Sequence, residues 1–164
     1  MITLHNFNQL SPDAALVALQ PCVAIPNWAE EVIRGRPYPS REALLSTAER
    51  LAQRWDRAAL TQALSAHPRI GENPPGAESA LSRQEQGAVN NSDAQLAAAL
   101  RDGNARYERR FGQVFLIRAK GRSGDDILQA LNARMKNSDA QEVQVALEQL
   151  REITMLRLEG AIGE

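Results

Sequence analysis

The chain has 164 residues, 43% of them hydrophobic and 24% charged, a composition typical of one globular domain with a substantial core. Its 19 Lys and Arg residues and 20 Asp and Glu residues leave a net charge of −1, which argues against nucleic acid or a membrane surface as a partner. The single cysteine, Cys22, excludes an internal disulfide and is typical of a small buried thiol in a reducing compartment. The N-terminus lacks a signal-peptide pattern and no apolar run approaches the about 18 residues of a membrane helix, so we expect a cytoplasmic protein.

Helix signals recur along the chain, whereas strand signals are scarce. Ser11-Pro12 is typical of a helix N-cap followed by proline at the first helical position. Four later serines start capping boxes, in which the cap and the residue three positions on bond to each other's backbone: Ser82 with Glu85, Ser92 with Gln95, Ser123 with Asp126 and Ser138 with Gln141. We therefore predict helices near residues 12–19, 26–34, 40–54, 56–66, 82–90, 92–110, 123–136 and 139–160.

Two stretches interrupt the helical pattern. Residues 35–39 and 68–80 are rich in proline and glycine, so neither is helical throughout. The apolar run at 115–117 has no evident strand partner, so we expect an extended segment that crosses the core. The patterns predict an all-α, single-domain helical bundle of about eight helices over residues 1–164, with one irregular Pro/Gly-rich loop after His67.

His67 is the most informative residue, because the chain has only one other histidine, His5. It ends a helical run, and the following Pro68 restricts it to an extended conformation that holds the ring at a defined angle. A histidine that merely favours the C-terminal end of a helix dipole is the structural interpretation. The functional interpretation is an acid or base that titrates near neutral pH.

Glu85 and Gln86 fall in the first turn of the helix predicted to begin at Ser82. As the third helical residue of a capping box, Glu85 has a structural interpretation as well. A helix start also offers free backbone N–H groups to an anionic ligand, and the Gln86 amide suits the same ligand. We therefore predict that His67 and Glu85 form an acid–base pair.

Arg157 continues a mainly apolar stripe of the last helix, after Val143, Leu147, Leu150 and Thr154. The structural interpretation is an arginine at the edge of the core whose charged end reaches water. The functional interpretation is a guanidinium that enters a pocket and holds a carboxylate. Arg134 is placed similarly relative to Ile127 and Leu131, and there we favour a structural role.

The sequence lacks a Gly-rich phosphate loop, a Cys/His cluster with zinc spacing and an acidic calcium loop. We therefore expect neither a metal nor a nucleotide cofactor.

Four ordered blocks cover nearly the whole chain: His67-Pro68 with Ile70-Gly71, Ser82-x-x-Glu85-Gln86, Phe111-Gly112-x-x-Phe115, and Leu156-Arg157-Leu158. In these blocks, and in Trp28, Arg36-Pro37-Tyr38 and Tyr107, the chain resembles the 2-oxo-4-hydroxy-4-carboxy-5-ureidoimidazoline (OHCU) decarboxylases of urate degradation.

The resemblance implies an all-α bundle, a cofactor-independent lyase and a homodimer. It implies conversion of OHCU, a small anionic substrate, to (S)-allantoin and CO₂ with stereospecific protonation. It implies that His67, Glu85 and Arg157 are catalytic, with Arg157 on the substrate carboxylate. Our own hypothesis is that His67 is the proton donor. The implied substrate contacts are Pro68, then Ser82, Arg83, Gln84, Glu85 and Gln86, then Phe115, Leu116, Ile117, Arg118 and Ala119.

Two positions depart from many relatives. Arg69 stands where many have an acidic residue, and Gln113-Val114 replaces a Phe-Pro pair. These departures leave open a related enzyme acting on another small anionic ureido or imidazoline compound. A non-enzymatic helical interaction module is the other alternative, and it predicts a groove of exposed apolar residues instead of a pocket.

Overall fold

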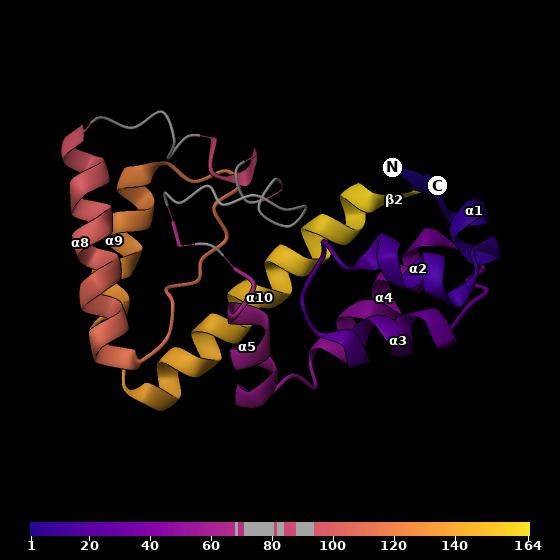
Figure 1. Ribbon diagram of the computed structural model, residues 1–164, viewed down its shortest axis with the longest axis horizontal. Helices are drawn as coiled ribbons and strands as arrows, with labels where there is room; N and C mark the ends of the chain where they lie inside the picture. Colours follow the sequence, from indigo (N-terminus) through magenta and orange to yellow (C-terminus); the bar gives the residue numbers. More distant parts are fainter. Residues whose placement is uncertain (68, 71–80, 82–83, 88–93) are drawn as a thin grey trace. The chain divides into compact units, whose positions relative to one another are not determined.

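The structure is a computed structural model that describes residues 1–67, 69–70, 81, 84–87 and 94–164. It confirms the all-α class, because the described residues form eight helices and two strands of two residues each (Figure 1). The helices are α1 (Leu4–Gln9), α2 (Pro12–Leu19), α3 (Pro26–Arg34), α4 (Arg41–Ala52), α5 (Arg57–Leu64), α8 (Ala94–Phe111), α9 (Gly124–Arg134) and α10 (Asp139–Ala161). The strands are β1 (Ile2–Thr3) and β2 (Ile162–Gly163).

The chain divides into two compact units. The first contains residues 1–63 and 151–164, and the second contains residues 64–150. Helix α10 therefore contributes its first half to the second unit and its last half to the first. The single domain over residues 1–164 stays a prediction.

The predicted helix boundaries agree well with the structure. Helices α2 and α3 begin and end at the predicted residues, and the other observed helices with a predicted counterpart differ from it by at most two residues at either end. The N-cap at Ser11 and the boxes at Ser123 and Ser138 are confirmed, since each serine hydroxyl accepts from the backbone three residues on. The boxes at Ser82 and Ser92 and most of the predicted helix 82–90 lie outside the described residues, although Leu81, Gln84 and Glu85 are helical.

Helix α1 and the two strands were not predicted. The Thr3 hydroxyl caps α1 by accepting a hydrogen bond from the Asn6 backbone N–H at 3.2 Å. Strand β1 pairs in parallel with β2, so Ile2 lies opposite Ile162 and the two chain ends meet within the first unit (Figure 1). Strands of two residues are too short to show a periodic pattern, which explains the omission.

The first unit is built on α2, α3 and α4. The indole N–H of Trp28 in α3 donates to the Ala48 carbonyl in α4 at 3.0 Å, and the Trp28 and Trp55 rings pack edge to face. The Arg36 guanidinium donates to the carbonyls of Phe7 and Leu10, which secures the end of α1. Several residues of the family pattern therefore have structural roles in this unit.

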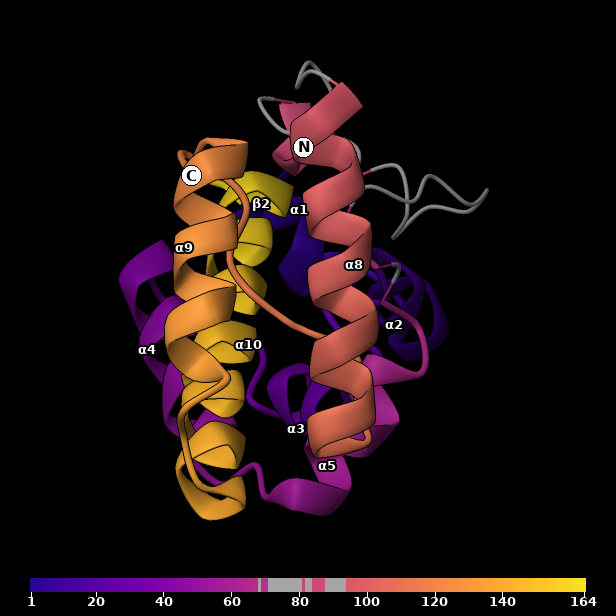
Figure 2. The same ribbon diagram turned by 90° about the vertical axis from the view of Figure 1, so that its left-hand side faces the viewer.

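The second unit is centred on α8 and α9, which lie side by side (Figure 2). A Cβ at Gly103 of α8 would lie 3.2 Å from both terminal methyls of Leu131 in α9, so the glycine permits this close approach. The core of the unit contains Ile70, Leu100, Tyr107, Phe115, Ile117, Ala119, Ile127 and Leu131.

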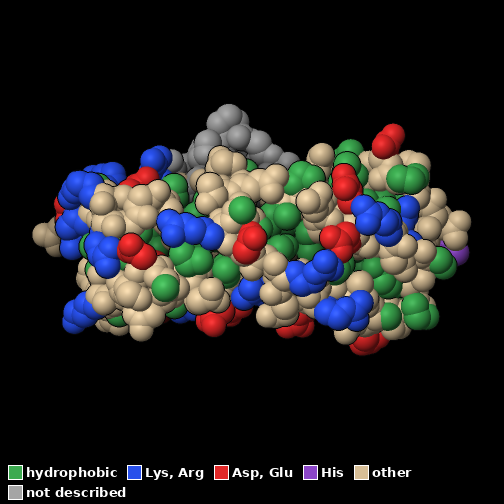
Figure 3. Space-filling view, turned by 90° about the horizontal axis from the view of Figure 1, so that it is seen from below, with side chains coloured by type: hydrophobic (Ala, Val, Ile, Leu, Met, Phe, Trp, Pro, Cys, Tyr) green, Lys and Arg blue, Asp and Glu red, His purple; other side chains and the backbone are tan. Residues whose placement is uncertain are grey.

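Surface charge follows the near-neutral composition. On the face shown in Figure 3, basic and acidic side chains are interspersed. Within the described part of the chain, no helix is both long and apolar enough to cross a membrane.

Candidate functional site

His67 follows the last turn of α5. Its backbone N–H donates to the Leu64 carbonyl at 3.2 Å, which confirms its place at a helix end. The side chain is half-buried, and its Nε2 atom is shielded from solvent. Of the loop predicted over residues 68–80, only Arg69 and Ile70 lie within the described residues, so Pro68 lies outside them.

The residues after the His67-Pro68 pair are attached to α8. Arg69 forms a bidentate ion pair with Glu108, with Nε–Oε2 and Nη2–Oε1 distances of 3.0 and 2.8 Å. The Asn104 side-chain amide donates to the Ile70 carbonyl at 3.2 Å, and the Ile70 side chain lies in the core. The first departure from the family pattern, Arg69, therefore has a specific partner of opposite charge.

The predicted helix start at Ser82 is described in part. Gln86 is buried with 4% of its surface exposed, Glu85 is half-buried and Gln84 is exposed. Ser82 and Arg83 lie outside the described residues. Of the three described residues, Glu85 and Gln86 are the better placed for a ligand shielded from water.

The segment 115–119 lies outside the helices and strands and is largely buried, which agrees with the core-crossing segment predicted at 115–117. Phe115, Ile117 and Ala119 belong to the core of the second unit, in the alternation expected of an extended chain. The Leu116 carbonyl accepts from Arg134 Nη1 at 2.7 Å, and the Arg118 backbone N–H donates to Gln149 Oε1 at 2.8 Å. The backbone of this segment is therefore fixed by side chains of α9 and α10.

A buried ion pair supports this segment. Arg134 is 7% exposed, and its Nε and Nη2 atoms lie 3.0 and 2.6 Å from Oε2 of the fully buried Glu142. The Arg134 guanidinium also stacks 4.5 Å from the centre of the Phe115 ring. The structural role predicted for Arg134 is confirmed, but the sequence interpretation missed Glu142.

Tyr107 joins the same network by donating its hydroxyl hydrogen bond to the Glu142 carboxylate. Burial, together with this hydrogen bond, raises the pKa of Tyr107 above its usual value. The Gln113 amide in turn donates to the Tyr107 hydroxyl at 3.3 Å. Gln113, the second departure from the family pattern, is thus also bonded to a residue of α8. That residue, Tyr107, directly precedes Glu108.

Arg157 lies in the first unit and is buried, with only 6% of its surface exposed. Its Nη1 donates to the Pro21 carbonyl at 3.2 Å. The interpretation of an edge arginine whose charged end reaches water is therefore wrong. Because His67 and Glu85 belong to the second unit, the convergence of the three side chains stays a prediction.

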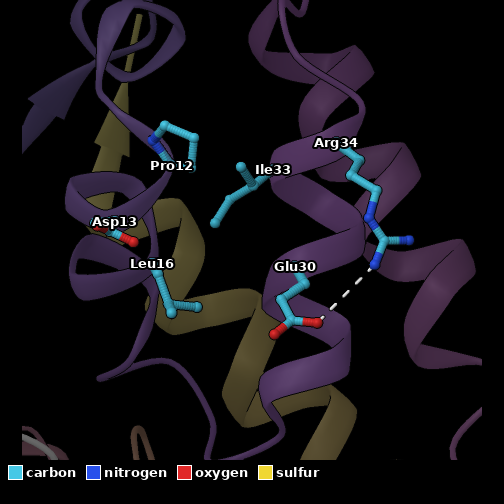
Figure 4. Close-up of a pocket in the computed structure, with 6 residues that line it drawn as sticks. All are labelled: Pro12, Asp13, Leu16, Glu30, Ile33 and Arg34. Atoms are coloured by element: carbon cyan, nitrogen blue, oxygen red, sulfur yellow. Dashed lines mark ion pairs between the residues drawn. The ribbon is translucent and has the colours of Figure 1, made fainter.

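A surface pocket in the first unit lies between α2 and α3 (Figure 4). It has a volume of about 290 Å³ and is lined by Pro12, Asp13, Leu16, Glu30, Ile33 and Arg34. Its one arginine is already 3.9 Å from Glu30, and Asp13 adds a second negative charge. No predicted site residue lines this pocket, and its charges do not favour an anionic substrate.

No group of three or more His, Cys, Asp or Glu side chains among the described residues is arranged to hold a metal ion. The absence of a cofactor stays a prediction. Within the same part of the chain, only Met1 and Val17 are large, apolar and exposed.

Comparison with known proteins agrees with the sequence blocks. The family model for OHCU decarboxylase matches residues 8–159. The 2-oxo-4-hydroxy-4-carboxy-5-ureidoimidazoline decarboxylase of Amia calva is 32% identical over 87% of this chain and 81% of its own length. That of Haloferax volcanii is 27% identical, and the match covers 96% of this chain and 94% of that protein.

A solved structure of OHCU decarboxylase in the presence of (S)-allantoin is similar in fold. The TM-score is 0.73 at 28% identity, covering 86% of this chain and 94% of that chain. Fold and sequence together define an all-α decarboxylase of urate degradation. The chain belongs to the OHCU decarboxylase family.

Proposed function

We propose that the chain converts OHCU to (S)-allantoin and CO₂, with His67 delivering the proton that sets the configuration of the product. The observation that carries the proposal is the family match over residues 8–159, which includes His67, Glu85 and Arg157. The remaining steps follow from the chemistry of the substrate and the burial of these side chains.

The substrate supplies its own electron sink. Its carboxylate is attached to a carbon that bears a hydroxyl and adjoins an imine. When the bond to the carboxylate breaks, CO₂ leaves and the electron pair moves toward the adjacent C=N. The pair forms a C=C bond to the imine carbon, and the imine nitrogen takes up a proton. The hydroxyl then loses its proton as its carbon becomes the carbonyl carbon, and a proton added to one face of the former imine carbon, which bears the ureido group, gives one enantiomer of allantoin. The protein has to hold the ring, stabilise the developing negative charge and deliver that proton.

Arg157 is the residue we assign to the substrate carboxylate. Burial strengthens the attraction between a guanidinium and an anion, because less water screens the charges. The 6% exposure of Arg157 supports this role. The forked donors of arginine also match the two oxygens of a carboxylate.

We assign the hydroxyl and ureido side of the substrate to His67 and Glu85. His67 has its Nε2 shielded from solvent, and Glu85 is half-buried. Gln86, buried beside Glu85, adds an amide able to donate or accept. Proton delivery by His67 is the step that makes the reaction stereospecific.

From the segment 115–119 we assign substrate contacts to backbone groups and to Leu116 and Arg118. The side chains of Phe115, Ile117 and Ala119 are used in the core. Because Arg134 and Gln149 hold the backbone on either side of Ile117, the segment offers polar groups in fixed positions.

The proposal includes a cofactor-free enzyme, a homodimer and a cytoplasmic location. Cofactor independence is supported by the electron sink in the substrate. A reducing compartment suits the single cysteine, which is buried. The homodimer is carried over from the family resemblance, and its test is the mass of the protein in solution.

Circular dichroism of the allantoin product tests the reaction. Urate oxidase and hydroxyisourate hydrolase generate the unstable substrate in situ, with and without this protein. We expect rapid growth of an (S)-allantoin signal, because the uncatalysed decay yields racemic allantoin without a signal. A racemic product at the uncatalysed rate would reject the assignment and favour another ureido or imidazoline substrate.

Arg157→Ala tests the anchoring role in the same assay. We expect a rise in KM that exceeds the fall in kcat, because Arg157 is proposed to bind the carboxylate of the intact substrate before CO₂ leaves. An unchanged KM would refute that role.

A further inference from the structure

Two residues of α8 at a spacing of four bind the two residues that follow His67-Pro68, and a third, one turn earlier, belongs to the same core cluster as Ile70. Leu100, Asn104 and Glu108 occupy successive turns, so their side chains share one face of the helix. Leu100 shares the core with Ile70, Asn104 donates to the Ile70 carbonyl, and Glu108 holds Arg69. This face of α8 therefore holds the two-residue segment Arg69-Ile70.

His67 is consequently held from both sides within the second unit. On its N-terminal side, its own N–H is bonded to the Leu64 carbonyl. On its C-terminal side, Arg69 is attached to α8 only two residues away. Successive Cα atoms are separated by about 3.8 Å, so a displacement at Arg69 is transmitted over a very short distance to His67.

The ion pair between Arg69 and Glu108 is partly exposed, so it can orient the chain without contributing much to stability. The Arg69 and Glu108 side chains are 47% and 26% exposed, and ion pairs near water contribute little to the free energy of unfolding. Their two parallel hydrogen bonds nevertheless fix a direction. The pair is therefore suited to orienting the chain, and its loss leaves the fold in place.

Asn104 shows a related imbalance. It is 5% exposed, and its Oδ1 accepts no hydrogen bond within the described part of the protein. A buried amide with an unsatisfied oxygen lowers stability. The hydrogen bond that the Asn104 side chain does form, from its amide N–H to the Ile70 carbonyl, therefore connects α8 to the segment after His67.

We propose that Glu108 and Asn104 are positioning residues for His67, acting through Arg69 and the Ile70 carbonyl. The inference rests on the proposed role of His67 in proton delivery. It has a specific consequence: Arg69→Glu places two carboxylates together and disturbs His67.

A charge-exchange series tests the proposal with Arg69→Glu, Glu108→Arg and the double variant Arg69→Glu/Glu108→Arg. We expect each single variant to lower kcat about fivefold and to reduce the enantiomeric excess of (S)-allantoin, while KM changes less than kcat. The double variant, which restores an ion pair of opposite direction, should return close to the wild-type values.

Arg106→Glu is the matched control. Arg106 lies on the same helix in an exposed ion pair with Asp102 at 3.0 Å, and no contact connects it to the segment after His67 among the described residues. We expect wild-type kcat and enantiomeric excess for this variant. Equal losses in Arg106→Glu and Arg69→Glu, which change the net charge by the same amount, would show a general effect of charge and overturn the proposal.

The imidazole signals in NMR spectra give a readout that does not depend on activity. The chain has two histidines, so a His5→Gln background leaves the His67 ring as the only histidine signal. That signal should shift or broaden in each single variant and return in the double variant. An unchanged signal in both single variants would overturn the positioning role even if the wild type produced no (S)-allantoin, an outcome that would refute only the proposed function.

Discussion

Two of the predicted site segments in the second unit are held in different ways. Segment 115–119 is fixed by the buried pair of Arg134 and Glu142, whereas Arg69, two residues after His67, is held by the half-exposed Glu108. A buried pair is costly to change one partner at a time, since the remaining charge is left without compensation. An exposed pair tolerates change, and the departure at Arg69 occurs at the exposed pair.

The comparison indicates which residues serve folding and which adjust the site. Arg134 and Glu142 connect α9, α10 and the extended segment, so they are part of the fold. Glu108 contributes orientation in a place where water already screens the charges. Substitutions at Arg134 or Glu142 should therefore mainly lower stability, whereas substitutions at Glu108 should mainly lower activity.

The largest effect is expected at Arg134. Arg134→Met leaves the Glu142 carboxylate buried without its main partner, so the free energy of unfolding should fall by about 3–5 kcal/mol. Urea unfolding followed by circular dichroism measures the change. The double variant Arg134→Met/Glu142→Leu removes both charges and should recover much of the loss. A loss for Arg134→Met as small as that for Glu108→Gln would remove the distinction between the two pairs.

A smaller effect is expected at Tyr107. Tyr107→Phe deletes the hydrogen bond to Glu142 but keeps the ring, so the free energy of unfolding should fall by about 1–3 kcal/mol. Urea unfolding at neutral pH measures this loss. Arg106→Ala, at an exposed position of the same helix, is the control. A substitution at Phe115 would not serve, because that side chain is only 2% exposed.

The same variant has a distinct alkaline behaviour. The pKa of Tyr107 is raised in the folded protein, mainly by burial, so above a pH of about 10 the unfolded chain loses its phenolic proton first. The stabilising contribution of neutral Tyr107 is present below that pH and decreases as the pH rises. The wild type should therefore lose stability more steeply than Tyr107→Phe above pH 10, by up to about 1.4 kcal/mol per pH unit. Parallel curves in urea unfolding between pH 9 and about 11 would contradict this account.

The smallest effect on stability is expected at Glu108. Glu108→Gln keeps the shape of the side chain and removes its charge, so the free energy of unfolding should change by less than about 1 kcal/mol and less still in high salt. Asp102→Asn in the same helix is the matched control. A loss comparable to that of Arg134→Met would show that Glu108 is part of the fold.

Much of the fold was predictable because its signals are local. The proline and serine at the start of α2 and the capping boxes at Ser123 and Ser138 specify helix starts within a few residues of chain. Helix α1 was missed because its six residues carry only the Thr3 cap as a signal. The pairing of β1 with β2 joins residues from opposite ends of the sequence, so no local pattern indicates it.

The site stays a prediction. Local patterns and the family resemblance indicate His67, Glu85 and Arg157 individually, but their relative placement depends on long-range packing. Glu142 was missed because an acidic residue in the first turn of a helix is typical of favourable dipole interactions. Its spacing of four from the buried Ala146 and of eight from the buried Leu150 was the available signal for burial.

The stereochemistry of the product formed by His67→Asn tests the central claim most directly. Circular dichroism of allantoin and CO₂ release should be followed together on freshly generated substrate, with urea unfolding of the same sample as a control for folding. We predict a folded protein with the wild-type free energy of unfolding within about 1 kcal/mol and no excess of (S)-allantoin over the uncatalysed reaction. A folded His67→Asn protein that still produces (S)-allantoin at the wild-type rate would contradict the assignment of His67 as the proton donor.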